Sequence, residues 1–512
     1  MAEKNFWDIN VDSSLKDAIH SDKLYDVLII GGGAGGLIAA VHAAEAGATV
    51  AILDKNKQLG GTAKCPMGIF GVGSNAQQRL GIEETADGCF ERHMTVNQWS
   101  CDARMVSGWM HGSRRVMNWL EAHGMDFDVV GGCSGPIQTY HMSHFRTGYM
   151  YVTNMLKYVE ELGIDVFTRH RAKKLLKNEA GAVCGLLADT EDGEVSFRAK
   201  SLIIATGSLA NNKDLLKKAF PDRDYSNVKC MGALPFATGD GYVMAMEAGA
   251  ASGRVSPNYI GPHNHPRDVM VGALLRRPHM MIVNKLGERY VDENIFSNGP
   301  FGWFSGKALE EQPDRICFPI MDALCFEDMK LHPEVASEVE GNQTRHDPKT
   351  GLLDPSRSKT AWLEEVESHI PKEIDADMMK ICDTLEEVAE YIGCDLQTLQ
   401  ETIERYNAFC DKGKDEDFLK DPHYLFPVRQ APYYVFRGLH GIDNFIGGIK
   451  INWRMQVLTP ESKPIPGLYA CGIATSGWLG YGYGHAGSEM GLSTYSGFTA
   501  GENAAKYAER QN

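Results

Sequence analysis

Three glycines near the start of the chain have the spacing of a phosphate-binding loop. Gly31, Gly33 and Gly36 form a Gly-x-Gly-x-x-Gly pattern. In such a loop the first glycine permits a tight turn, the second lets backbone N–H groups approach a pyrophosphate, and the third allows close packing of helix on strand. An apolar run over 25–30 precedes the loop, and an alanine-rich stretch over 37–46 follows it. These flanks predict a strand and a helix, so the loop indicates a dinucleotide site at a helix N-terminus.

An acidic residue follows at the position where a ribose would lie. Asp54 closes a second predicted strand over 49–53, 23 positions after Gly31. A carboxylate there accepts hydrogen bonds from ribose hydroxyls. Its charge would repel a 2′-phosphate, which disfavours NADP as the ligand of this loop.

Four later glycine turns extend the pattern beyond a simple nucleotide loop. They lie at 60–63, 205–207, 237–241 and 467–472, and two of them directly follow apolar runs typical of parallel strands. Each turn alone is ordinary. Together, in this order, they favour FAD over NAD and place the N-terminal and C-terminal parts of the chain in one sheet.

With these motifs the chain resembles the fumarate reductase/succinate dehydrogenase flavoprotein superfamily, in the soluble branch that includes the 3-ketosteroid dehydrogenases. The resemblance runs from about residue 25 to about 505 and includes Asp54, Asp240 and the Gly-Gly pair at 447–448. Covalent members carry a histidine in the loop after the first Gly-Gly pair, whereas 62–66 holds none, so non-covalent FAD is expected. The expected FAD contacts are Gly31, Gly33, Ala34, Gly35, Gly36, Asp54, Lys55, Gly61, Thr62, Gly68, Ala172, Thr206, Gly207, Asp240, Gly472, Ile473, Ser488, Met490 and Gly491.

The resemblance implies an α/β fold built from two units. The first is a Rossmann-like, discontinuous (GR2-type) FAD-binding domain over 22–258 and 443–512. The second is an inserted α+β capping domain over 259–442, which carries a predicted strand at 281–284 and helices at 384–392 and 396–409. The polar stretch 332–358 is interpreted as a surface excursion.

The carboxylate-binding positions of the soluble fumarate reductases are largely replaced. His263 resembles their first substrate histidine, with His265 as a competing candidate. Ser297 stands four residues after the Glu of the Arg-Tyr-Val-Asp-Glu motif at 289–293, where the proton-donating arginine is expected, and Asn444 stands where the second histidine is expected. No arginine occurs over 478–492. Since a dicarboxylate needs charge-assisted bonds, fumarate and succinate are disfavoured as substrates.

The loop without arginine resembles the ketosteroid dehydrogenases instead. Tyr483 and Gly487 reproduce their Tyr-x-x-x-Gly pattern. In that family the tyrosine hydroxyl and the glycine N–H polarise a substrate carbonyl, which acts as an oxyanion hole while hydride moves to or from flavin N5. That family's other tyrosine is replaced by Ser297, so Tyr481, and then His263, are the substitute proton donors or acceptors.

Several other residues have two possible roles. Phe301, Trp303, Phe304 and Trp478 fit either an apolar substrate pocket or the core of the cap. A polar-aromatic cluster at 140–144 fits either the cavity or ordinary packing. Arg276 and Arg277 are typical of a surface pair.

Composition excludes some classes of function. A formal net charge of -16 argues against nucleic-acid binding. The 12 cysteines include no Cys-x-x-Cys pair, so no metal site is expected. Residues 1–24 lack an apolar signal region, and no apolar stretch is long enough to span a membrane, which favours a cytoplasmic location.

Three hypotheses follow. The favoured one is an FAD enzyme, working in the direction of reduction, that acts on a C–C bond next to a carbonyl in a small hydrophobic, ring-bearing substrate such as a steroid or isoflavonoid. The others are a reductase of unsaturated or aryl-acrylic carboxylates and a flavoprotein electron-transfer subunit. Because no second dinucleotide loop is visible, reduced nicotinamide and an electron carrier both remain candidate donors.

Overall fold

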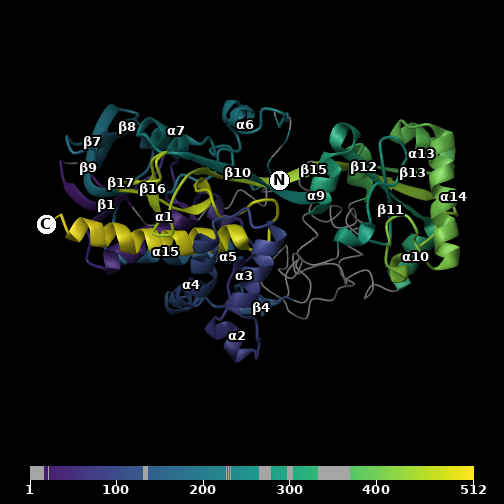
Figure 1. Ribbon diagram of the computed structural model, residues 1–512, viewed down its shortest axis with the longest axis horizontal. Helices are drawn as coiled ribbons and strands as arrows, with labels where there is room; N and C mark the ends of the chain where they lie inside the picture. Colours follow the sequence, from purple (N-terminus) through teal and green to yellow (C-terminus); the bar gives the residue numbers. More distant parts are fainter. Residues whose placement is uncertain are drawn as a thin grey trace.

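Two units lie side by side in the computed structural model, joined by two long strands (Figure 1). The structure describes residues 16–20, 22–130, 137–225, 228, 230, 232–263, 278–296, 304–331 and 370–511. One unit holds both the first helix α1 and the last helix α15. The other unit holds α10, α13 and α14.

An eight-stranded sheet organises the first unit. Its main path is β16-β17-β9-β1-β2-β6, and the β7–β8 hairpin joins the edge of β9. Strands β6, β2, β1, β9 and β17 run parallel. Because parallel strands are covered on both faces, they consist of nearly continuous apolar residues, and Val27 to Ile30 of β1 are buried. The expectation that the N-terminal and C-terminal parts share one sheet is therefore confirmed. The strands are β1 (Leu24–Ile30), β2 (Val50–Leu53), β6 (Asp165–Phe167), β7 (Arg171–Lys177), β8 (Val183–Thr190), β9 (Gly193–Ile204), β16 (Gln456–Leu458) and β17 (Pro464–Ala470).

Small residues let two helices pack closely on this sheet. A Cβ added to Gly497 of α15 would lie 2.2 Å from the Gly35 carbonyl oxygen, and one added to Gly501 would lie 2.5 Å from that of Ala39. The helices α1 (Ala34–Glu45) and α15 (Ser488–Glu509) therefore approach one another backbone to backbone. The unit's other helices are α2 (Asn75–Arg79), α3 (Ala86–Val96), α4 (Ala103–Ala122), α5 (Thr147–Glu161), α6 (Lys213–Ala219) and α7 (Asp240–Glu247), and a small sheet contains β3 (Ile69–Phe70), β5 (Tyr140–Met142) and β4 (Asp128–Val130).

The second unit is a six-stranded antiparallel sheet with helices. Its order is β10-β15-β12-β14-β13, with β11 paired to β12. The expected strand at 281–284 is β11 (Met281–Asn284), and the expected helical pair is α13 (Leu385–Ile392) and α14 (Leu396–Lys412). The remaining elements are β12 (Ile316–Asp322), β13 (Met379–Cys382), β14 (Tyr433–Phe436), α9 (Phe304–Glu310) and α10 (Ala323–Leu331). The predicted excursion at 332–358 lies outside the described residues.

Two paired strands carry the chain between the units. They are β10 (Ser252–His263) and β15 (Gly438–Ile449), which run antiparallel (Figure 1). The expected domain boundaries at 258/259 and 442/443 fall inside these strands. The register places Asn258 opposite Asn444 and then shifts, so that Tyr259 faces Ile442 and Asp443 is an extra residue. Such a bulge re-aims side chains and is frequent beside active sites.

Candidate functional site

A cavity lies where the parallel strands end. Its walls come from the turns after β1, β2, β9 and β17. This is the edge at which open α/β sheets bind cofactors. Fifteen of the residues expected to contact FAD line this one cavity: Gly31, Gly33, Ala34, Gly35, Asp54, Lys55, Gly61, Thr62, Ala172, Thr206, Gly207, Asp240, Gly472, Ile473 and Met490.

Each glycine of the phosphate-binding loop lies where its expected role requires it. Gly31 has a φ of 101°, in the left-handed region that favours glycine. A Cβ on Gly36 would lie 1.9 Å from the Gly31 carbonyl oxygen, so this glycine permits the helix to pack on the turn. Gly33 is the N-cap of α1, and a Cβ there would meet nothing within 4 Å. The helix N-terminus therefore opens toward the cavity, as an anion site requires.

Asp54 holds this loop as well as lining the cavity. One carboxylate oxygen accepts a hydrogen bond from the Gly32 N–H at 2.9 Å, and the other accepts one from the Asn56 N–H at 2.8 Å. Burial raises the pKa of Asp54, although these hydrogen bonds act in the opposite direction. The side chain is thus fixed in place before any ligand binds.

A second acid in the cavity is tied to two cations. Asp240, in the first turn of α7, accepts hydrogen bonds from Lys55 at 2.8 Å and from Arg171 at 2.9 Å. Burial acts to raise the pKa of Asp240, but the bonds from Arg171 and Lys55 outweigh it and the pKa is lowered. Nearby, the buried hydroxyl of Thr206 has no hydrogen-bond partner among the described residues. A polar ligand atom would satisfy this hydroxyl, so the residues present fit a dinucleotide.

Four of the expected FAD contacts pack against protein instead of lining the cavity. A Cβ on Gly68 would lie 2.5 Å from the Tyr140 ring, and one on Gly491 would lie 2.9 Å from Phe70. Gly36 packs on the Gly31 turn, and the Ser488 hydroxyl donates to the His485 carbonyl at 2.6 Å. These residues pack behind the residues that line the cavity.

A buried acid that sequence reasoning missed lines the same cavity. Glu489, in the first turn of α15, accepts hydrogen bonds from the side-chain amides of Asn258 at 2.8 Å and Asn444 at 3.4 Å. Burial, reinforced by the nearby Asp443 carboxylate, raises the pKa of Glu489 to about 8. The Oδ1 atom of Asn258 is buried and has no hydrogen-bond partner among the described residues. The Asn258–Asn444–Glu489 cluster is therefore rich in acceptors and contains no cation.

Tyr483 and Gly487 lie directly behind this cluster. The Tyr483 hydroxyl accepts a hydrogen bond from the Glu489 N–H at 2.8 Å, and burial raises its pKa well above the ordinary value. Gly487 caps α15 with a φ of 74°, and a Cβ there would lie 2.6 Å from the Phe70 nitrogen. Both residues are thus held at the N-terminus of α15, next to the cavity but outside its lining.

The other sequence candidates are scattered. Tyr481 is 39% exposed in a separate surface hollow, where Arg254 and Lys307 lie over its ring, 5.1 and 4.8 Å from the ring centre. His263 ends β10 opposite Leu439, and Ser297 lies outside the described residues. His265, Arg276, Arg277, Phe301 and Trp303 also lie outside them, while Phe304 begins α9 and Trp478 is fully buried.

The polar-aromatic cluster at 140–144 belongs to packing. His141 is fully buried, its ring nitrogen lies 2.7 Å from the Ser74 hydroxyl, and burial lowers its pKa to about 4. His144 is exposed and lies 3.3 Å from Asp126. None of these side chains lines the cavity.

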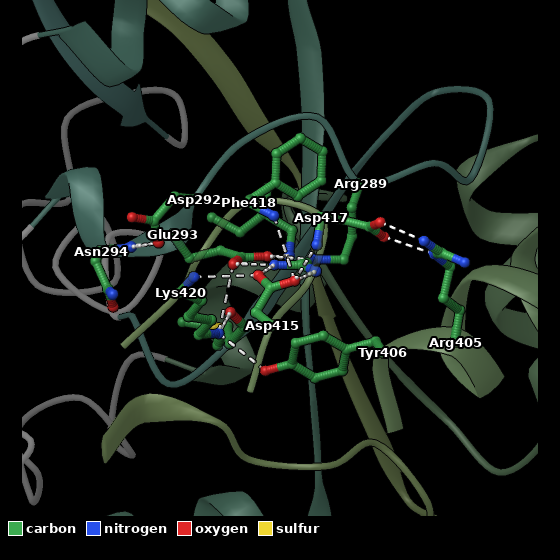
Figure 2. Close-up of polar contacts among 12 residues, drawn as sticks. Arg289, Asp292, Glu293, Asn294, Arg405, Tyr406, Asp415, Asp417, Phe418 and Lys420 are labelled. Carbon is green, nitrogen blue, oxygen red and sulfur yellow. Dashed lines mark hydrogen bonds and ion pairs between the residues drawn. The ribbon is translucent and has the colours of Figure 1, made fainter. Parts of the chain in front are cut away.

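The Arg-Tyr-Val-Asp-Glu motif forms a closed ion cluster in the cap (Figure 2). Arg289 binds Glu293 at 2.8 Å and Asp415 at 2.9 Å, and Lys420 lies 3.5 Å from Glu293. Lys420 also donates to Tyr406 at 2.9 Å and to the Met280 carbonyl at 3.0 Å. This cap ion cluster holds two cations and two carboxylates, and its residues do not line the cavity.

Two kinds of feature are absent from the described residues. They contain no group of three or more His, Cys, Asp or Glu side chains arranged to hold a metal ion. Among the helices they form, none combines the length and apolar character needed to cross a membrane.

Comparison with known proteins supports the interpretation of the cavity as an FAD site. Residues 26–489 match the FAD binding domain family. Vinyl phenol reductase of Lactiplantibacillus plantarum is 27% identical over 509 residues, covering 95% of this chain and 98% of that protein. The open conformation of a flavocytochrome c3 fumarate reductase is 26% identical with a TM-score of 0.70, covering 95% of this chain and 79% of that one. The 3-ketosteroid-delta4-(5alpha)-dehydrogenase of Rhodococcus jostii, solved with 4-androstene-3,17-dione, shares the fold at 23% identity and a TM-score of 0.71, covering 97% and 100%. The superfamily expected from sequence and FAD as the cofactor are therefore confirmed, and non-covalent attachment stays a prediction.

Proposed function

The chain belongs to the FAD binding domain family, and on that premise we propose that it reduces a C–C double bond conjugated to a carbonyl in a hydrophobic, ring-bearing substrate. That it is an FAD-dependent oxidoreductase of unsaturated C–C bonds follows from the family and its relatives. The steroid-like or isoflavonoid-like substrate and the direction of reduction are the proposal. FAD, when bound, supplies the hydride.

The observation that carries the proposal is the chemistry of the Asn258–Asn444–Glu489 cluster. Besides His170, the cations that line the cavity among the described residues are Lys55 and Arg171, and both bind Asp240. A substrate carboxylate next to Glu489 would meet a group that is protonated below its pKa of about 8 and negatively charged above it, and at neither pH would it find the charge-assisted pairs it needs. A neutral ring-bearing molecule meets no such penalty.

Tyr483 and the N-terminus of α15 stabilise the charge that forms during the reaction. Hydride addition to a conjugated double bond places negative charge on the carbonyl oxygen. The Tyr483 hydroxyl accepts a bond from the Glu489 N–H, and such a chain polarises the hydroxyl as a donor. The helix N-terminus adds a favourable dipole.

The alternatives are weaker on the same grounds. A reductase of aryl-acrylic carboxylates needs a cation beside the cluster, and the hydrogen bonds described for the Glu489 carboxylate come from the amides of Asn258 and Asn444. An electron-transfer subunit does not require a buried acid in the cofactor cavity. The electron donor, reduced nicotinamide or a carrier protein, belongs to the proposal.

Removing the Tyr483 hydroxyl tests this function. In steady-state turnover of a cyclic enone with a reduced dye, Tyr483→Phe is expected to lower kcat about 10²-fold, the usual effect of losing one oxyanion donor. FAD content should be unchanged. The control is Tyr507→Phe, near the far end of α15. Wild-type kcat in Tyr483→Phe would remove Tyr483 from the proposal.

A further inference from the structure

Reduction of a conjugated double bond needs a proton source as well as a hydride source. A hydride that adds to one carbon of an enone leaves an enolate, and a proton must then reach the carbon next to the carbonyl. Tyr481, the first substitute donor expected from the sequence, lines a separate surface hollow, and Ser297 lies outside the described residues. Since a proton donor must lie within reach of the reacting atoms, the residues that line the cavity are the place to look for it.

The titratable side chains of the described cavity wall form two sets. One set surrounds the end of β2, because the Asp54 carbonyl accepts from the His170 N–H at 3.0 Å and Asp240 binds Lys55 and Arg171. The other set consists of Cys471 and Glu489. Burial raises the pKa of the Cys471 thiol to about 12, so this group holds its proton tightly. Glu489 is the remaining acid.

The carboxyl group of Glu489 is oriented beside the residue that would stabilise the enolate oxygen. The Glu489 N–H donates to the Tyr483 hydroxyl at 2.8 Å in the first turn of α15. The side-chain amide of Asn258 donates to Glu489 Oε1 at 2.8 Å, and that of Asn444 lies 3.4 Å from Oε2. Amide N–H groups donate and do not accept, so neither amide nitrogen takes up the carboxyl proton.

Resting on the proposed function, we propose that Glu489 is the proton donor of the reaction and gives its carboxyl proton to the carbon next to the substrate carbonyl. The hydride adds to the far carbon with its electron pair, as in the proposed function. The electron pair of the resulting enolate forms the second C–H bond with the Glu489 proton, and the product is the saturated ketone. Glu489 is left as a carboxylate and regains a proton from water after the product leaves.

The surroundings of Glu489 keep the acid supplied with its proton. Burial, with the like charge of the Asp443 carboxylate, raises the pKa of Glu489 to about 8, so most of this group is protonated near neutral pH. A general acid works best when its pKa lies near the working pH. Two other titratable neighbours stay neutral there, because burial raises the pKa of the Cys230 thiol to about 12 and that of Tyr483 well above its ordinary value.

Hydrogen exchange into a saturated ketone tests this role without net reduction. The oxidised, FAD-loaded protein is mixed with a saturated cyclic ketone in D₂O under anaerobic conditions, and deuterium next to the carbonyl is measured by NMR. In this direction the Glu489 carboxylate is the base, so the exchange rate of the wild type should rise with pH with a midpoint near 8. Glu489→Gln should lower the rate at least about 10²-fold, the usual contribution of a general acid–base group. Glu502→Gln, on the same helix but ion-paired to Lys506, is the control and should keep the wild-type rate.

An infrared difference spectrum of the FAD-loaded protein between pH 6 and pH 9.5 tests the same acid without any substrate. The wild type should lose a carboxylic-acid C=O band as the pH rises, and the Glu489→Gln spectrum should lack that band. The Glu502→Gln spectrum should keep it. The same band in Glu489→Gln as in the wild type would show that Glu489 does not carry the proton.

Three further results would overturn the proposal. The first is exchange at the wild-type rate in Glu489→Gln. The second is reduction of enones by a wild type that does not exchange the ketone. The third is a Glu489→Gln protein that loses FAD and regains wild-type exchange when FAD is in excess, which would assign Glu489 to cofactor binding. Exchange that depends on Glu489 without any reduction of cyclic enones would instead contradict the proposed function and leave the acid–base role standing.

Discussion

Two buried groups of charged and polar residues in this molecule follow opposite rules. The cap ion cluster pairs Arg289 and Lys420 with Glu293 and Asp415, and the cations lower the pKa values of both acids even though burial opposes this (Figure 2). In the Asn258–Asn444–Glu489 cluster, burial and a second carboxylate raise the pKa of Glu489 to about 8. We call the first group closed, because its cations and carboxylates pair with one another. We call the second open, because the carboxylate of Glu489 is paired with amides and not with a cation.

The difference separates structure from chemistry. A compensated buried network fixes the shape of the cap and has nothing left to offer a ligand. A buried acid with a shifted pKa in a cofactor cavity has unmet capacity, which is typical of functional sites. The motif at 289–293, which resembles a catalytic signature, belongs to the cap ion cluster. Glu489, which no sequence motif marks, belongs to the Asn258–Asn444–Glu489 cluster.

The largest expected effect is on the closed cluster. Arg289→Met leaves two buried carboxylates with one lysine, and breaking such a pair costs about 3–5 kcal/mol. We expect a corresponding loss in the free energy of unfolding, measured with urea. Arg405→Met, which breaks the exposed pair with Asp417 in the same region, should cost far less. Similar losses in the two variants would show that the cap cluster is not a closed structural unit.

The next effect is a pH dependence that belongs to the open cluster. The unfolded chain releases the Glu489 proton near the ordinary value of 4.5, and the folded chain holds it to about 8. Between these values the folded state binds more protons, so this residue makes stability fall as pH rises. Glu489→Gln should remove that part of the slope, measured as the midpoint of thermal unfolding from pH 5 to 8 without ligand. An unchanged slope would mean that Glu489 ionises normally.

The smallest effect comes from giving the open cluster a cation. Asn444→His places an imidazole beside Glu489, which should lower the pKa of the acid and move ligand preference toward carboxylates. We expect a shift of about tenfold in the ratio of affinities for a cyclic enone and an aryl carboxylate, since one pKa unit corresponds to about 1.4 kcal/mol. Competition titrations on the FAD-loaded protein measure it. A ratio equal to the wild type would separate Glu489 from ligand choice.

Much of the fold was predictable because its signals are local. The apolar run before Gly31, the turns at 206–207 and 471–472, and the helices at 385–392 and 396–412 are each recognisable from neighbouring residues. Parallel strands end at one edge, so the turns had to converge there. The same argument predicts the position of the phosphate-binding loop and most of the residues that line the cavity.

The Asn258–Asn444–Glu489 cluster could not be predicted in this way. Its geometry depends on the register of β10 against β15, 186 residues apart at Asn258 and Asn444, and on the shift at Asp443. The local hints are Asn444, at the position where the second substrate histidine is expected, and an acid between Gly487 and Gly491 at the start of a helix of small residues. Gly68 and Gly491 were assigned to FAD, but their positions are required by Tyr140 and Phe70, which local sequence does not reveal.

The most direct test of the central claim is anaerobic reoxidation of the reduced, FAD-loaded protein by single substrates. A cyclic enone that bears an apolar ring system should reoxidise the flavin and yield the saturated ketone. Fumarate should reoxidise it no faster than buffer. Fast reoxidation by fumarate with no reaction of the ring compounds would contradict the account.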